Sequence, residues 1–217
     1  MSFQKLVDAA QKYFPSLQIK YKNTSLLMKI VGTILFFNKD FTDNYTTTLG
    51  STVYFANESY TRLRPISAAV VLLHELVHIE DAKKFTPFLF VTLYLMPQLL
   101  SIFCLPLLFV LSWKLVVPIC LLLAAPLPAY FRMIFEKRAY LSSLYVLHRI
   151  GKKFHFEPHL KTQAIYFNNQ FKNSFYYFMW PLGIKKDLNE ALIKIEAGNR
   201  PFQDPIFDVL DNLIDQY

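Results

Sequence analysis

The chain has 217 residues, of which 53% are hydrophobic and 18% are charged, and Lys and Arg outnumber Asp and Glu by 23 to 16. This composition excludes a disordered chain, a collagen-like chain and a coiled coil, and it is more apolar than that of an ordinary soluble domain. The net charge of +7 could reflect binding to nucleic acid, contact with a membrane surface or a topology signal. The positions of the basic residues along the chain therefore have to separate these classes.

The N-terminal part predicts one helix and a few strands. Residues 1–14 have their apolar side chains on one helical face and lack the apolar core of a signal peptide. Residues 19–40 contain apolar clusters followed by turn formers, which predicts one or two strands. Residues 45–56 are β-branched and aromatic around Gly50, which predicts a hairpin or a bulged strand.

The next predicted helix carries a metal-binding pattern. It begins at Pro65, because proline is favoured in a first helical turn, and it contains the sequence HExxH at His74, Glu75 and His78. The two histidines lie four residues apart, so they project from one face and can bind one Zn²⁺. Glu75 lies beside them and would act as the general base toward a metal-bound water. Polar residues are costly to bury in an apolar helix without such a role.

Two long apolar stretches follow this helix. Residues 85–113 contain no charge, Lys114 interrupts, and residues 115–131 are again uncharged. An apolar run of about 18 residues or more predicts a transmembrane helix. We therefore expect residues 85–131 to form a transmembrane helical hairpin with its turn at residues 112–114.

The distribution of basic residues supports the same topology. Only Lys114 lies within the hairpin, and basic residues gather at its two ends: Lys83, Lys84, Arg132, Lys137 and Arg138. Because positive charge is retained on the cytoplasmic side of membranes, both termini are predicted to be cytoplasmic. The net charge is then explained by topology and by contact with anionic lipid, and a nucleic-acid partner is not expected.

A helix predicted over residues 132–150, and ended by Gly151, supplies the favoured third zinc ligand. His78 lies seven residues before the hairpin and Glu136 five residues after it. If both helices leave the membrane straight, the two residues stand roughly 10 Å and 7 Å above the same surface. Glu136 is therefore the expected third ligand. Other candidates considered for this role are Asp81, His148, His155, Glu157 and His159.

A metal site that activates water for attack on a carbonyl also needs a donor to the oxyanion that forms. Tyr140 lies one turn after Glu136 and His148 lies twelve residues after it, so these two are the catalytic candidates for that role. The remaining chain, residues 160–217, is predicted to be helical in pieces that are separated by Pro and Gly.

The motifs HELVHIED and EKRAY, separated by an apolar hairpin, resemble those of gluzincin metallopeptidases. The resemblance is closest to the membrane-integrated CAAX prenyl endopeptidases and HtpX-type proteases. It implies that Glu136 belongs to an ExxAD motif, in which Tyr140 stands in place of the aspartate. Tyr140 or Asp81 would then support a zinc ligand in its stead. The strand before HExxH is similar to a zincin edge strand, which implies that an extended peptide binds along residues 48–55.

Together these features predict an α+β fold, a zincin-like metallopeptidase domain with an inserted two-helix transmembrane hairpin. Residues 1–84 and 132–217 would form the two halves of a cytoplasmic domain, and residues 85–131 the hairpin. We expect a zinc metalloendopeptidase, integral to a bacterial cytoplasmic membrane or that of a phage-infected host, which cleaves membrane-proximal polypeptides. Its partners would be the polypeptide substrate and the lipid bilayer. The alternative is a membrane-anchored binding or remodelling protein on the same scaffold, with structural zinc or none.

Overall fold

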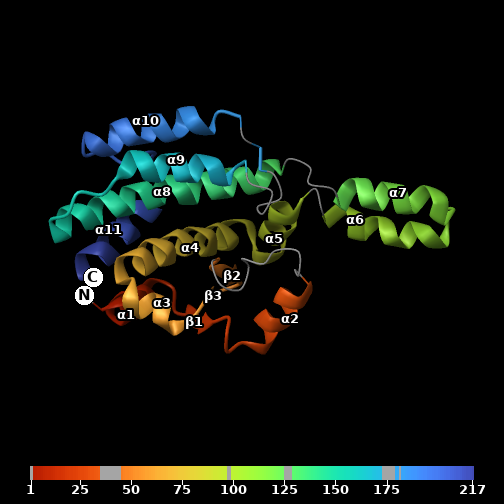
Figure 1. Cartoon of the computed structure of the whole chain (residues 1–217), viewed down its shortest axis with the longest axis horizontal. Coiled ribbons are helices and arrows are strands. Elements are labelled where there is room, and N and C mark those ends of the chain that lie inside the picture. The colour runs from red at the N-terminus through yellow and green to blue at the C-terminus, as the bar shows by residue number, and fades with distance from the viewer. Residues whose placement is uncertain (1, 35–44, 97–98, 125–128, 173–178, 181) are drawn as a thin grey trace.

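The computed structural model describes residues 2–34, 45–96, 99–124, 129–172, 179–180 and 182–217 (Figure 1). Helices dominate this part of the chain, and three short strands form one small sheet. The strands are β1 (Gln18–Tyr21), β2 (Thr47–Leu49) and β3 (Thr52–Phe55). The helices are α1 (Phe3–Tyr13), α2 (Leu26–Ile34), α3 (Glu58–Leu63), α4 (Pro65–Phe85), α5 (Pro87–Leu95), α6 (Leu99–Cys104), the 3-10 helix η1 (Leu105–Phe109), α7 (Trp113–Ala124), α8 (Tyr130–Phe154), α9 (Leu160–Gln170), α10 (Ile184–Glu196) and α11 (Ile206–Gln216).

Helices α4 and α8 form the centre of the fold and pack along each other (Figure 1). The sheet and α1 to α3 lie on one side of this pair, and α9 and α10 lie on the outer side of α8. Leu72 and Leu76 of α4 and Leu144 of α8 are completely buried in the core that joins these layers. Burial of apolar side chains on both central helices is the main force that holds the layers on the two sides of the α4–α8 pair together.

The sheet has the order β1-β3-β2, so β3 is central. It pairs with β1 in parallel and with β2 antiparallel, and the predicted hairpin over residues 45–56 is confirmed. Its turn contains Gly50 at φ 61°, a left-handed conformation that glycine adopts without steric cost. Thr48 lies opposite Val53, which is fully buried, so this side of β2 faces the core and α4.

The segment 19–40 differs from its prediction within the described residues. β1 forms as expected, but residues 26–34 fold as the helix α2 instead of a second strand. Ser25 accepts a hydrogen bond from the amide of Met28, which caps the start of this helix. Met28 then packs on Tyr54 of β3. The cap and this packing together stabilise the helix over the predicted strand.

Helix α8 continues past the residue that was predicted to end it. Gly151 lies inside the helix, which runs to Phe154 and ends at His155 in the left-handed conformation. The glycine is needed for close packing, since a Cβ atom at this position would lie 2.7 Å from Cδ of Pro158. The short chain reversal that leads into α9 therefore packs directly against the backbone of α8.

The predicted α+β class with a transmembrane hairpin is wrong. Among the described residues, none of the helices combines the length and the apolar character needed to cross a bilayer. The apolar stretch is divided into α5, α6, η1 and α7, and α7, the longest, has 12 residues and is about 18 Å long. A bilayer core is about 30 Å thick. This finding contradicts the predicted transmembrane helices. The predicted integral-membrane localisation and the topology that was deduced from these helices are therefore also wrong.

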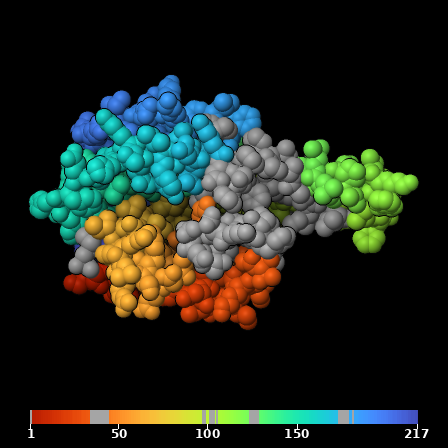
Figure 2. Space-filling model, in the orientation of Figure 1, coloured from red at the N-terminus to blue at the C-terminus, as the bar shows by residue number. Residues whose placement is uncertain are grey.

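The four short elements have two different places in the fold. Helix α5 folds back against α4 and α8, because Thr86 has φ 65° and turns the chain between α4 and α5. Helices α6 and α7 pack on each other and project from one end of the molecule (Figure 2). The membrane explanation of the net charge is also lost. Several of the basic residues instead form ion pairs within the fold, among them Lys137, Arg138, Arg149 and Arg200.

Candidate metal centre

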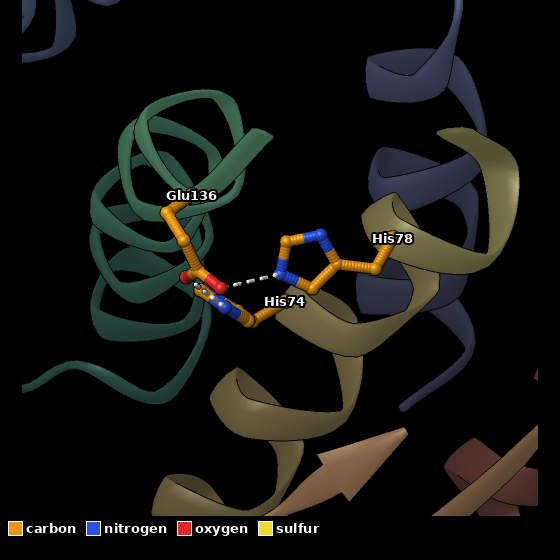
Figure 3. A group of neighbouring side chains, drawn as sticks. All are labelled: His74, His78 and Glu136. Carbon is orange, nitrogen blue, oxygen red and sulfur yellow. Dashed lines mark ion pairs between the residues drawn. The ribbon is translucent and has the colours of Figure 1, made fainter. Parts of the chain in front are cut away.

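Three side chains with metal-binding atoms meet at the interface of α4 and α8. His74 and His78 project from α4, and Glu136 projects toward them from α8 (Figure 3). One ligand atom from each residue can be chosen so that all three lie within 4.8 Å of one another. The described residues thus bring together the three side chains that sequence analysis favoured as ligands, in an arrangement compatible with a metal site.

The distances in this group fit a small tetrahedral ion. Nε2 of His74 lies 3.5 Å from Oε2 of Glu136, and Nε2 of His78 lies 3.5 Å from Oε1. Bonds of about 2.0–2.1 Å in a tetrahedral zinc site place neighbouring ligand atoms about 3.3–3.4 Å apart. The spacing between His74 and Oε2 therefore needs only a small adjustment to accept such an ion, and one ligand atom from each of the three residues lies within 4.8 Å of the others.

Several atoms at this interface are buried and have no hydrogen-bond partner. They are Nδ1 of His78, Oδ2 of Asp81 and Oε2 of Glu136. Native proteins satisfy most buried polar groups, because an unsatisfied one costs about 1–3 kcal/mol or more if it is charged. A cation bound by Glu136 would satisfy Oε2, which is the observation that most directly supports a metal here.

The tautomer of His74 is set by Ser143. The hydroxyl of Ser143 donates to the carbonyl of Ala139 at 2.9 Å and also lies 3.1 Å from Nδ1 of His74. Because the hydroxyl proton is used, Nδ1 of His74 must carry a hydrogen and donate it to Ser143. In the neutral imidazole the lone pair then lies on Nε2, the nitrogen that faces Glu136. His74 is thereby prepared to bind a metal through Nε2.

Replacing Ser143 by Ala is expected to weaken metal binding by about 10- to 100-fold, because the orientation and tautomer of His74 are no longer fixed. Competition with a chromophoric chelator measures this affinity. Ser142 is the matched control: it is also buried on α8, and its hydroxyl donates to the carbonyl of Arg138 in the same way. Ser142→Ala should bind metal like the wild type. Equal losses in both variants would contradict the assigned role of Ser143.

A second carboxylate on α4, that of Asp81, influences His78. Asp81 lies three residues later, which places both side chains on one face of the helix. Oδ1 of Asp81 accepts from Arg138 at 2.6 Å, whereas Oδ2 and Nδ1 of His78 are both without partners. The charge of Asp81 also contributes to the raised pKa of His78. Asp81 thus acts on His78 through its charge, and Tyr140, the other supporting residue expected from the sequence, packs beside His74.

The charges of the group depend strongly on one another. Burial alone would lower the pKa of His78, but the carboxylate of Glu136 outweighs burial and raises this pKa to about 9. Burial would likewise raise the pKa of Glu136, yet the neighbouring His78 and His74 hold it well below its usual value. Without a metal the two partners thus form a buried ion pair, and a metal must displace the proton of His78.

Glu75 lies next to this group and is hydrogen-bonded to a residue of the sheet. It is 8% exposed, and its Oε2 accepts a hydrogen bond of 2.7 Å from the hydroxyl of Thr48 on β2. Its charge also helps to raise the pKa of His78, so its carboxylate lies near the ligands. The strand that precedes HExxH is therefore connected directly to the candidate base.

The two residues expected to stabilise an oxyanion have different surroundings. The ring of Tyr140 lies 4.9 Å from that of His74 and packs on Phe167 and Phe171, so Tyr140 forms one wall of the site. His148 lies twelve residues beyond Glu136 on α8, about 18 Å along the helix axis, and does not join the group. The other candidate ligands outside α4 lie farther still, at the end of α8 and the start of α9: His155, Glu157 and His159.

Two residues near the site were not found by sequence reasoning. Tyr94 of α5 donates a hydrogen bond of 2.5 Å to Oε1 of Glu136. Tyr94 was missed because it lies within an apolar stretch that was interpreted as a membrane segment. The spacing of Phe90 and Tyr94, at positions i and i+4, nevertheless indicates an aromatic helix face. Lys22 follows β1, is 1% exposed, and has a pKa that burial lowers to about 8 against the opposing charge of Glu75. No sequence signal points to Lys22.

Comparisons with protein-family models, with curated proteins and with solved structures found no match for this chain.

Proposed function

We propose that this protein is a zinc-dependent endopeptidase, with His74, His78 and Glu136 as zinc ligands and Glu75 as general base. The observation that carries the proposal is the meeting of these three ligands, with Oε2 of Glu136 buried and unsatisfied, beside the Glu75 carboxylate. Two imidazoles and one carboxylate are a ligand set that catalytic zinc sites use. The 3.5 Å between Nε2 of His74 and Oε2 of Glu136 fits zinc better than the longer bonds and larger oxygen shells of calcium.

The number of ligands favours catalysis over a structural role. Structural zinc sites are closed by four protein ligands, whereas catalytic sites have three and leave a position for water. Within the part of the chain that the structure describes, the group consists of His74, His78 and Glu136 alone. The alternative, a binding protein with structural zinc, would need a fourth side chain at this place.

The residues around the site support hydrolysis. Zinc bound here would lower the pKa of a coordinated water and polarise the attacked carbonyl. Glu75 takes the proton from the attacking water and delivers it to the nitrogen of the leaving amine. Thr48 orients Glu75 through its hydroxyl, and Tyr140 packs against His74 to limit its motion.

The position of β2 supports a peptide as the substrate. β3 is paired on both sides, so an extended peptide cannot pair with it, and the expected binding strand is narrowed to β2. Among the described residues, only β3 pairs with β2. A peptide added along the other edge of Thr47–Leu49 would run next to Thr48, whose side chain contacts Glu75.

The proposal is tested by metal analysis together with cleavage of an unstructured protein such as casein. We expect one zinc per chain and cleavage that stops after chelation and returns with one equivalent of zinc. A protein that holds zinc firmly but cleaves neither casein nor a diverse peptide library supports the structural alternative. A purified protein that binds no transition metal contradicts the site itself.

A further inference from the structure

Tyr94 reaches the metal centre from a third helix. The left-handed Thr86 ends α4 and lets α5 fold back against both α4 and α8. The hydroxyl of Tyr94 then donates to Oε1 of Glu136 at 2.5 Å, and its ring lies edge-on to His78 with centroids 6.1 Å apart. Tyr94 therefore contacts one ligand by a hydrogen bond and a second by its ring.

The hydrogen bond makes the two oxygens of Glu136 different. Each oxygen lies 3.5 Å from Nε2 of one histidine, Oε1 from His78 and Oε2 from His74. Oε1 also accepts the Tyr94 hydroxyl, whereas Oε2 is buried without a hydrogen-bond partner. A short O–H···O bond to a carboxylate is a strong, charge-assisted interaction. It reduces the tendency of Oε1 to bind a cation and leaves Oε2 as the available ligand atom.

Helix α8 also holds Tyr94 in place. Arg132 lies one turn before Glu136, and its Nε donates to the carbonyl of Tyr94 at 2.9 Å. Its guanidinium group also lies 4.9 Å from the centroid of the Tyr94 ring. Tyr94 is thus fixed by its backbone, its ring and its hydroxyl against the same helix that carries the ligand.

We propose that Tyr94 is a positioning residue that restricts Glu136 to one metal–oxygen contact, through Oε2, and so preserves the coordination position that water needs. A carboxylate that binds through both oxygens occupies two positions and crowds a site meant for four ligands. Hydrogen bonds to ligating carboxylates are a known means of controlling their geometry. This inference rests on the proposed zinc function and adds a control of coordination number to it.

Cobalt(II) in place of zinc tests the inference, because its visible bands are intense in four-coordinate sites and weaken when a fifth ligand binds. The metal-free wild type, Tyr94→Phe and Tyr145→Phe are each titrated with cobalt(II) alone. Tyr145 is the matched control: it lies on α8 and donates to Asp211 at 2.9 Å, away from the site. We expect intense bands from the wild type and Tyr145→Phe, and a clear loss of intensity from Tyr94→Phe.

An unchanged Tyr94→Phe spectrum, or the same loss in both variants, overturns the inference. X-ray absorption of the zinc-loaded wild type gives a result that does not depend on a variant folding: four directly bonded light atoms support it, and five overturn it. A wild type without intense cobalt bands or stoichiometric zinc refutes the proposed function, and the inference with it. A normal wild type with an unaffected Tyr94→Phe variant refutes the inference alone.

Discussion

Replacing Glu75 by Gln is expected to lower peptide cleavage by about 10²- to 10⁴-fold, the usual contribution of a general base. The amide has the same shape and can still accept the hydrogen bond from Thr48, but it cannot take a proton from water. The zinc content should stay at one per chain, because Glu75 is not among the grouped ligands. The loss should fall on kcat, with KM little changed, because the base acts in the transition state.

Glu80→Gln is the matched control for this change. Glu80 lies on the same helix, and its carboxylate pairs with Arg138 at 2.6 Å, on the side of α4 that faces Asp204. This variant should keep its cleavage rate within a few fold. Retained cleavage in the Glu75→Gln protein would remove Glu75 from the mechanism, and loss of zinc there would make it a ligand instead.

Replacing Glu136 by Gln is expected to reduce zinc affinity by at least 10²-fold, more than the loss of a residue that only supports a ligand. In the metal-free protein it should also remove stability in a pH-dependent manner. The pKa of His78 is about 9 in the folded protein, against an ordinary value of 6.5 that applies to the unfolded chain, and Glu136 is the main group that raises it. A raised pKa of this kind contributes about 3 kcal/mol below pH 6.5, and the contribution is lost as the pH rises through 9.

Denaturant unfolding in chelator at pH 6 and pH 9.5 measures this difference. Glu136→Gln should be clearly less stable than the wild type at pH 6 and nearly equal to it at pH 9.5. Asp211→Asn is the control, since this acid pairs with Arg149 and accepts from Tyr145. A loss for Glu136→Gln that is the same at both pH values would contradict the buried His78–Glu136 ion pair.

The ligand cluster could be predicted because its signals are local. Pro65 marks the start of α4, and the spacing of His74 and His78 places both on one helical face. Glu136 was found through the assumption that the segments flanking the apolar region are neighbours. The structure does place Glu136 beside the two histidines, but for a different reason, since α4 and α8 are held together by core packing.

The error in the apolar region has a physical cause. Hydropathy counts apolar residues but does not show where a helix stops. In this stretch α5 ends at Met96, which is extended, and a 3-10 segment that contains Pro106 follows α6. Part of its aromatic content serves the site, because Phe90 and Tyr94 lie against His78. Contacts between distant segments, such as those of Tyr94 with Glu136 and of Ser143 with His74, leave no periodic signal in one sequence.

The pairing of α4 with α8 also determines when during folding the site can form. His74 and Glu136 are 62 residues apart in the chain (74 and 136), so neither helix contains a complete ligand set. Contacts of such separation form late, after the entropy of closing the intervening loop has been overcome. A nascent chain displays both histidines well before Glu136 is synthesised, and it cannot hold zinc in the final geometry until α8 docks. Metal capture would therefore report completed assembly of the two halves.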